Sequence, residues 1–225
     1  MTRRPRVVEL IGAPGTGKSS VAAAIERVPG VVVVKDQRRR DLPGLIWSAA
    51  TAGRVLCARP PAGVSRLRWI AWVGRCRAFP RLARRRLAAG AQTVVLDQGP
   101  LYTLGRMADS ANRNSAVARW HRDRVADCGR LLDLVIVLDA ASSQLAARLQ
   151  SRAKSHRADD LPATAAVAYL ERERVTSRSI AGAVASAGAA LVEVDATNSL
   201  DENIAVVLAA LDTDPARISG SGEPA

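Results

Sequence analysis

The sequence has few of the residues that build disulfide frameworks and metal centres. Its 225 residues include three cysteines and two histidines, and the cysteines are too widely spaced for a zinc site or a disulfide framework. No apolar run reaches the ~18 residues of a membrane-spanning helix. The N-terminus, MTRRPRVVELIG, lacks the apolar core and cleavage site of a signal peptide. We therefore expect a soluble, cytoplasmic protein with reduced cysteines.

Lysine and acidic residues are also scarce, and arginine dominates the charge. Only three of the 33 basic residues are lysines, and 21 acidic residues leave a net charge of +12. Guanidinium groups suit phosphate oxygens, so we expect anionic partners: nucleotides, nucleic acid or an acidic membrane surface. Hydrophobic residues make up 48% of the chain, which excludes a wholly disordered protein.

Five short apolar runs predict strands that are buried on both faces, with helical segments between them. This alternation predicts one α/β domain over residues 1–211, in which helices cover both faces of a parallel sheet. One of the helices is expected over Leu101–Cys128, and a disordered tail over 212–225. The apolar runs are Val7–Ile11, Val31–Val34, Thr93–Leu96, Leu134–Leu138 and Ala190–Val194.

A helical insertion is expected over about residues 41–90. From Leu42 to Leu96 there is no acidic residue, and ten arginines fall between Arg54 and Arg86. Trp69, Trp72 and Cys76 recur at helical spacing, and Pro80 predicts a kink. Two interpretations stay open. The apolar stripe packs on the sheet while the arginines face solvent or an anionic substrate, or the helix binds an anionic membrane or single-stranded nucleic acid.

A complete phosphate-binding loop follows the first apolar run and precedes a helical pattern. Glycines let the backbone turn its N–H groups toward phosphates, and the helix N-terminus adds positive charge. Lys18 is expected to reach the β- and γ-phosphates of ATP, and the Ser19 hydroxyl to ligate Mg²⁺. The predicted nucleotide-binding residues are Gly12, Ala13, Pro14, Gly15, Thr16, Gly17, Lys18, Ser19 and the adjacent Ser20.

Two apolar runs end in an aspartate that could assist Mg²⁺. Ligands of parallel sheets bind beyond the carboxyl ends of the strands. Asp97 precedes the turn sequence Gln98-Gly99-Pro100, which leaves its side chain near this cleft. Asp139 leads into a helix and can serve as a cap or turn former. We predict that Asp97 is functional, that Gln98 contacts substrate and that Asp139 is structural.

Basic residues gather after the fourth apolar run and after the second. Arg148 and Arg152 share a helix face, and with Arg157 they predict a lid over about 148–160 that clamps a triphosphate and stabilises the transferred phosphoryl group. Asp36 and Arg38 follow the second run and are candidates to contact the acceptor.

These features resemble the nucleoside and nucleoside-monophosphate kinase group of P-loop proteins. The resemblance rests on GAPGTGKS, on Asp97 at the end of the third strand, on the arginines of the lid, and on the loop Asp195–Asn198. It implies a five-stranded sheet of order 2-3-1-4-5, an insertion over the substrate site, and a lid that closes on ATP. It also implies that Thr197 lies in the loop that contacts adenine.

The sequence thus predicts an ATP- and Mg²⁺-dependent kinase that phosphorylates a small acceptor at a hydroxyl or phosphate group, and the arginine content suggests that this acceptor is anionic. In this prediction Lys18, Asp97, Arg148 and Arg152 are the catalytic residues, and Ser19 and Asp97 hold the metal. One alternative is an ATP-binding P-loop regulator, and another is an ATPase associated with nucleic acid or membrane. Neither alternative needs a small-molecule acceptor.

Overall fold

Five parallel strands form one sheet in the order β2-β3-β1-β4-β5. The order implied by the resemblance to P-loop kinases is therefore confirmed, and the predicted α/β fold with it. The computed structural model describes residues 4–35, 64–151 and 160–214 together with Val55, Pro60 and Ile218, except for the side chains of 109–111 and 113. The strands are β1 (Arg6–Ile11), β2 (Val31–Val34), β3 (Thr93–Asp97), β4 (Leu134–Asp139) and β5 (Ala190–Asp195).

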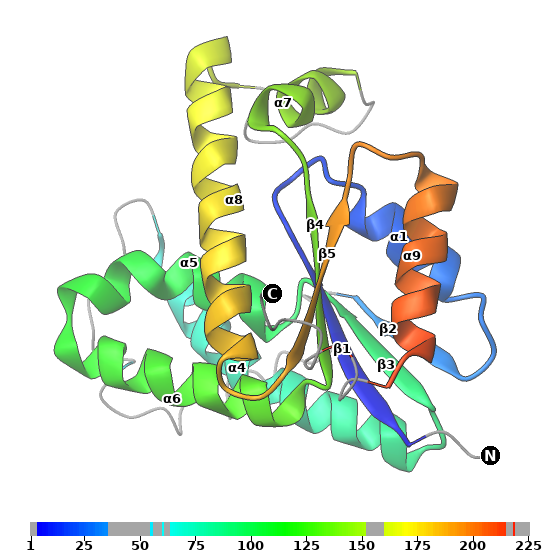
Figure 1. Cartoon of the computed structure of the whole chain (residues 1–225). Helices are drawn as coiled ribbons and strands as arrows, with labels where there is room; N and C mark the ends of the chain where they lie inside the picture. The colour runs from blue at the N-terminus through cyan, green and yellow to red at the C-terminus, as the bar shows by residue number, and fades with distance from the viewer. Residues whose placement is uncertain are drawn as a thin grey trace, which may run out of the picture.

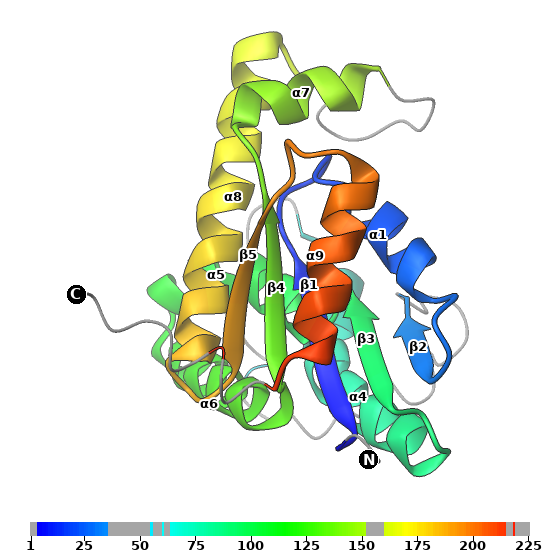
Figure 2. The same cartoon turned by 45° about the vertical axis from the view of Figure 1, so that its right-hand side comes forward.

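Helices cover both faces of the sheet (Figure 1), and a 45° turn brings one covering layer forward (Figure 2). Alternate strand residues face opposite ways, so Val7 and Ile11 join one core cluster while Val8 and Leu10 join the other. Helices α1 and α9 pack on the second cluster, and α4, α5 and α6 on the first. The helices are α1 (Lys18–Ile25), α4 (Arg66–Ala88), α5 (Pro100–Arg113), α6 (Ser115–Leu131), α7 (Ser142–Gln150), α8 (Ala163–Ala185) and α9 (Leu200–Asp212).

The helical segment predicted over Leu101–Cys128 is confirmed over most of its length, and the structure divides it at Asn114 into α5 and α6. Asn114 has extended backbone angles, and its side chain accepts hydrogen bonds from the N–H groups of Ala116 (3.0 Å) and Val117 (3.2 Å). Asparagine is among the best N-cap residues, so a second helix starts here. The break allows α6 to fold back beside α5.

Helix α4 carries the part of the insertion that the structure describes. Trp69, Val73 and Cys76 are buried in the first core cluster, and the indole N–H of Trp69 donates to the carbonyl of Val55 at 3.0 Å. The apolar stripe therefore packs inward, and the helix continues through Pro80. Within the described ranges, no helix combines the length and apolar character needed to cross a membrane.

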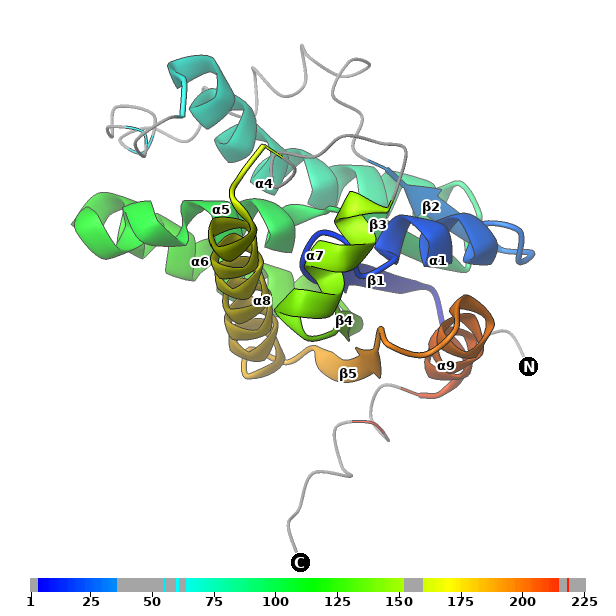
Figure 3. The same ribbon diagram turned by 90° about the horizontal axis from the view of Figure 1, so that it is seen from above.

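The carboxyl ends of the strands form the functional edge of the sheet. Viewed from above, α7 lies across this edge beside the upper end of α8 (Figure 3). Residues 152–159 of the predicted lid, most of 36–63 and most of the predicted tail lie outside the described ranges. The division into one domain and a tail stays a prediction.

Candidate functional site

The loop between β1 and α1 depends on glycine at its first position. Gly12 has φ +150°, and a Cβ atom there would lie 2.1 Å from the backbone oxygen of Leu138. Only a residue without a side chain lets the chain leave β1 so close to β4. Gly17, with φ +85°, then leads directly into α1. The helix N-terminus thus points its free N–H groups into the loop, as phosphate binding requires.

Lys18 is buried inside this loop. Its ammonium group donates hydrogen bonds to the backbone oxygen of Ala13 at 2.7 Å and to Oγ1 of Thr16 at 3.1 Å. Burial lowers the pKa of Lys18 to about 8, although the carboxylates of Asp97 and Glu173 act in the opposite direction. An anion bound in the loop would therefore favour the charged form of Lys18.

Asp97 lies beside Ser19 because β3 pairs directly with β1. The register places Asp97 opposite Leu10, one residue before the end of β1. One carboxylate oxygen of Asp97 accepts a hydrogen bond from Oγ of Ser19 at 3.2 Å, and the other is buried without a hydrogen-bond partner among the described residues. A hydroxyl oxygen and a carboxylate with a spare oxygen fit Mg²⁺, which takes oxygen ligands and keeps several waters.

The turn after Asp97 is held by a buried carboxyl group that the sequence analysis missed. Glu9 of β1 accepts hydrogen bonds from the backbone N–H groups of Leu101 (3.0 Å) and Tyr102 (3.3 Å) at the start of α5. Burial raises the pKa of Glu9 to about 8. Gln98 adopts φ +59°, and a Cβ atom at Gly99 would lie 2.8 Å from the Glu9 carboxyl carbon. The signal in the sequence is a charged residue inside an apolar strand.

Asp139 makes a different set of contacts. Both of its oxygens accept hydrogen bonds from the guanidinium group of Arg174 at 2.8 Å, and Arg178 lies 3.0 Å away. The hydrogen bonds from Arg174 lower the pKa of Asp139. This carboxylate therefore joins β4 to α8, which supports its predicted structural role.

Arg148 lies at the loop that follows β5. Its guanidinium group donates to the backbone oxygen of Ala196 at 2.6 Å, and the backbone N–H of Thr197 donates to the Asp195 carboxylate at 2.8 Å. The structure thus brings Arg148 to the predicted adenine loop. Ser20 is exposed on the first turn of α1. Asp36, Arg38, Arg152 and Arg157 lie outside the described residues.

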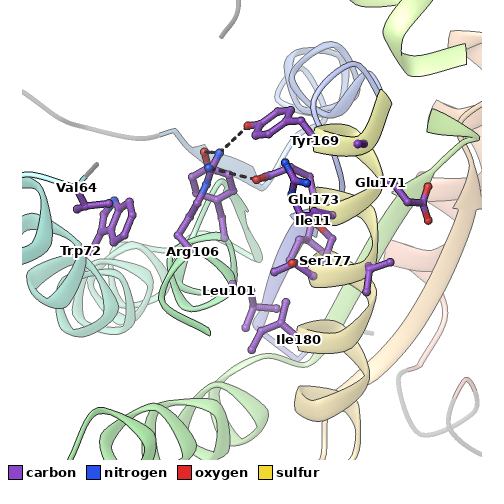
Figure 4. A pocket seen from close by; sticks show the side chains of 16 residues that line it. Ile11, Val64, Trp72, Leu101, Arg106, Tyr169, Glu171, Glu173, Ser177 and Ile180 are labelled. Carbon is purple, nitrogen blue, oxygen red and sulfur yellow. Dashed lines mark hydrogen bonds and ion pairs between the residues drawn. The ribbon is translucent and has the colours of Figure 1, made fainter. Parts of the chain in front are cut away.

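A cavity of about 580 Å³ opens beside the loop, between α4, α5 and α8 (Figure 4). Ile11, at the end of β1, is part of its wall, so the cavity adjoins the start of the phosphate-binding loop. The polar residues of its wall, which the sequence analysis missed, include Tyr102, Arg106, Tyr169 and Glu173.

The sheet order and the phosphate-binding loop define a P-loop NTPase fold of the nucleoside-kinase type. A family model described as an AAA domain matches residues 7–176, which is most of the chain. The chain therefore belongs to this AAA domain family. No curated protein sequence matches it significantly.

Structures of deoxyadenosine kinase from M. mycoides have a similar fold. The one with bound dATP has a TM-score of 0.56 and 15% sequence identity, covering 92% of this chain and 100% of that chain. The one with the products dCMP and a flexible dCDP has a TM-score of 0.54 and 16% identity, covering 92% and 98%. At this identity the likeness shows the fold alone, and it confirms the resemblance to P-loop kinases.

Proposed function

We propose that this protein is an ATP-dependent kinase that transfers the γ-phosphoryl group to a small-molecule acceptor. The observation that carries the proposal is the hydrogen bond between Ser19 of the phosphate-binding loop and Asp97, together with a cavity whose wall includes Ile11, the residue before the loop. A P-loop regulator without turnover needs the loop but neither the spare carboxylate oxygen nor the cavity.

The donor half of the site consists of the loop, Lys18 and Ser19. Backbone N–H groups of the loop bind the phosphates, and Lys18 neutralises charge on the β- and γ-phosphates. The Ser19 hydroxyl and Asp97 would hold Mg²⁺, directly or through water, and the ion would add further charge neutralisation. Arg148, Arg157 and Thr197 are proposed to contact the nucleotide, and Arg152 the transferred group.

In the acceptor half, Asp97 orients the acceptor hydroxyl. As the acceptor oxygen bonds to the γ-phosphorus, the bond from that phosphorus to the β-phosphate oxygen breaks and ADP leaves. The hydroxyl proton passes to Asp97 and then to solvent. Asp36, Arg38 and Gln98 are proposed acceptor contacts because they follow the neighbouring strands β2 and β3.

The test is ATP turnover with a panel of acceptors, comparing the wild type with Lys18→Ala. The panel holds nucleosides, nucleoside monophosphates, sugars and aminoglycoside-type alcohols. We expect one acceptor class to stimulate ADP release and Lys18→Ala to abolish it. The matched control is Lys35→Ala, because Lys35 is exposed and pairs with Glu26 at 2.6 Å. Its activity should equal that of the wild type.

Asp97→Asn tests the acceptor half separately. We expect a loss of about 100-fold or more in kcat, with ATP affinity changed less, because the phosphates are bound mainly by the loop. Full activity of Asp97→Asn with an identified acceptor would contradict its role as the base. Tight ATP binding without turnover on any acceptor would instead indicate a regulator.

A further inference from the structure

The wall of the cavity combines an apolar part with one compact polar cluster. Ile11, Trp72, Leu101 and Ile180 provide apolar surface (Figure 4). Such a wall suits the faces of a ring or the carbon skeleton of a small molecule. The polar cluster stands beside it and consists of Tyr102, Arg106, Tyr169 and Glu173, hereafter the Arg106 cluster.

Two helices contribute matching halves of the Arg106 cluster. Tyr102 and Arg106 are four residues apart on α5, and Tyr169 and Glu173 are four residues apart on α8, so each pair shares one helix face. The guanidinium group of Arg106 donates to the hydroxyls of Tyr102 (3.0 Å) and Tyr169 (3.3 Å). It also lies 3.2 Å from a carboxylate oxygen of Glu173.

This pairing decides which charge the cavity can accept. The positive charge of Arg106 is already matched by Glu173. The charged side chains in the described part of the wall are two arginines and two glutamates, so they sum to zero. Of these, Glu171 lies 2.7 Å from Arg174 and 2.5 Å from the Ser142 hydroxyl. Glu171 and the fourth charged residue, Arg172, are both exposed, so Arg106 is the one half-buried cation in the described part of the wall, and Glu173 matches it.

Glu173 also opposes an anionic acceptor for a second reason. The Glu173 carboxylate favours the charged form of Lys18, so its negative charge also acts on the phosphate-binding loop. A phosphate group bound at the Arg106 cluster would compete with Glu173 for Arg106 and would add negative charge beside that carboxylate. Hydroxyl groups can instead donate to Glu173, and they can accept from or donate to the two tyrosines.

We propose that the cavity selects an uncharged, polyhydroxylated acceptor with an apolar ring face, and that the Arg106 cluster discriminates against phosphorylated analogues of it. The proposal rests on the proposed kinase function, whose acceptor class it names. It also replaces the anionic acceptor that the arginine content of the sequence suggested. Glu173 and Arg106 act here as specificity residues, whereas Asp97 and Lys18 act on the reacting groups.

The test compares matched neutral and phosphorylated acceptors by ADP release. The pairs are the four deoxynucleosides with their 5′-monophosphates, and glucose with glucose 6-phosphate. A neutral member should be the best acceptor, and its phosphorylated partner at least about tenfold worse in kcat/KM. A phosphorylated member that is the best acceptor would overturn this inference and leave the kinase function intact. If no member of these pairs and no acceptor of the wider panel is phosphorylated while ATP binds, both proposals fail.

Glu173→Gln then tests the residue itself. Removing its charge leaves Arg106 unmatched, so discrimination against the phosphorylated partner should fall by about tenfold. The acceptor KM should rise while the KM for ATP stays near that of the wild type. Tyr169→Phe is a milder variant that should raise the acceptor KM alone. The control is Glu193→Gln, since Glu193 is exposed on β5 and pairs with Arg178 at 3.4 Å. Unchanged discrimination in a folded Glu173→Gln protein would overturn the role of the pair.

Discussion

At the scale of single residues, the site contains two ionisable side chains that burial removes from water. Lys18 and Glu9 are both buried, and burial moves the pKa of each toward about 8 from opposite directions. Such shifts gather at functional sites because burial and specific neighbours are combined there. Two experiments follow from the directions of these shifts.

Binding of MgATP should be coupled to protonation of Lys18. In the free protein the pKa is about 8, and phosphates favour the ammonium form, so binding raises the pKa. At pH 9 the free lysine is mostly neutral, and binding should take up roughly one proton. At pH 7 it is already charged, and the uptake should be close to zero. Calorimetry in buffers of different ionisation enthalpy measures this difference, and equal uptake at both pH values would contradict it.

Glu9 should make the fold less stable as the pH rises. Its folded-state pKa of about 8 lies above its ordinary value of 4.5. Between these values the folded protein holds a proton that the unfolded chain has released. The free energy of unfolding therefore contains a contribution that is complete below pH 4.5 and is lost as the pH rises through 8.

Glu9→Gln removes this titration. Urea unfolding at several pH values should show the wild type losing stability relative to Glu9→Gln between pH 5 and pH 8. Glu193→Gln serves as the control, because its carboxyl group is exposed. A difference between wild type and Glu9→Gln that does not change with pH would show that Glu9 is not protonated in the folded protein.

At the scale of elements, two strand-end aspartates do different work because their strands have different neighbours. β3 pairs with β1 and so brings Asp97 to the loop, whereas β4 brings Asp139 to the arginines of α8. An aspartate at the carboxyl end of a strand is thus predicted to lie near the edge of the sheet where ligands bind. Whether that aspartate can contact a ligand depends on whether a neighbouring helix pairs with it.

Asparagine substitutions should separate the two roles. Asp139→Asn breaks a buried ion pair and should lower the free energy of unfolding by about 1–3 kcal/mol at pH 7. Because the pKa of Asp139 is lowered, its contribution exists above the ordinary pKa and is lost as the pH falls through the folded-state value. Asp97→Asn should lose turnover with stability nearly unchanged. Denaturation and ADP release measure both, and a reversed pattern would exchange the two assignments.

The helix boundaries of this chain depend on local capping residues. Ser199 caps α9 as its sequence indicates, with Glu202 completing a reciprocal pair of hydrogen bonds. Asn114 also caps a helix, since its side chain accepts hydrogen bonds from two N–H groups of the next turn. Both boundaries therefore depend on a capping side chain close to them in the sequence.

At the scale of the whole molecule, the net charge of +12 predicts electrostatic attraction to anionic polymers. Within α4, Trp69 is buried and Trp72 lines the cavity, so neither indole lies on an outer face that could stack on bases. Any contact with nucleic acid through this helix is therefore expected to rest on arginine and phosphate charge alone.

A single-stranded oligonucleotide should bind weakly, and added salt should release it. We expect binding at low ionic strength to be lost by about 200 mM salt, because each neutralised phosphate releases counterions. A mobility-shift assay over a salt series measures this, with Lys18→Ala behaving like the wild type. Binding that survives about 500 mM salt would favour the alternative of a nucleic-acid-associated ATPase.

The sequence by itself determined the strands and the phosphate-binding loop, while the sheet order was implied by the resemblance to P-loop kinases. These depend on short-range signals: apolar runs, glycines before a lysine, and a fixed chain order of strands and helices. Gly12 illustrates this, since its place in the pattern already implied the turn that the close approach to β4 requires.

Only the tertiary structure brings together the residues of the proposed acceptor side. Tyr102 and Arg106 are separated from Tyr169 and Glu173 by more than sixty residues, and no local pattern shows that α5 and α8 face one another. The pairing of Arg106 with Glu173 cancels charges that the sequence could only sum. A net positive composition therefore suggested an anionic acceptor, whereas the packing of two helices leaves a cavity whose described wall carries no net charge.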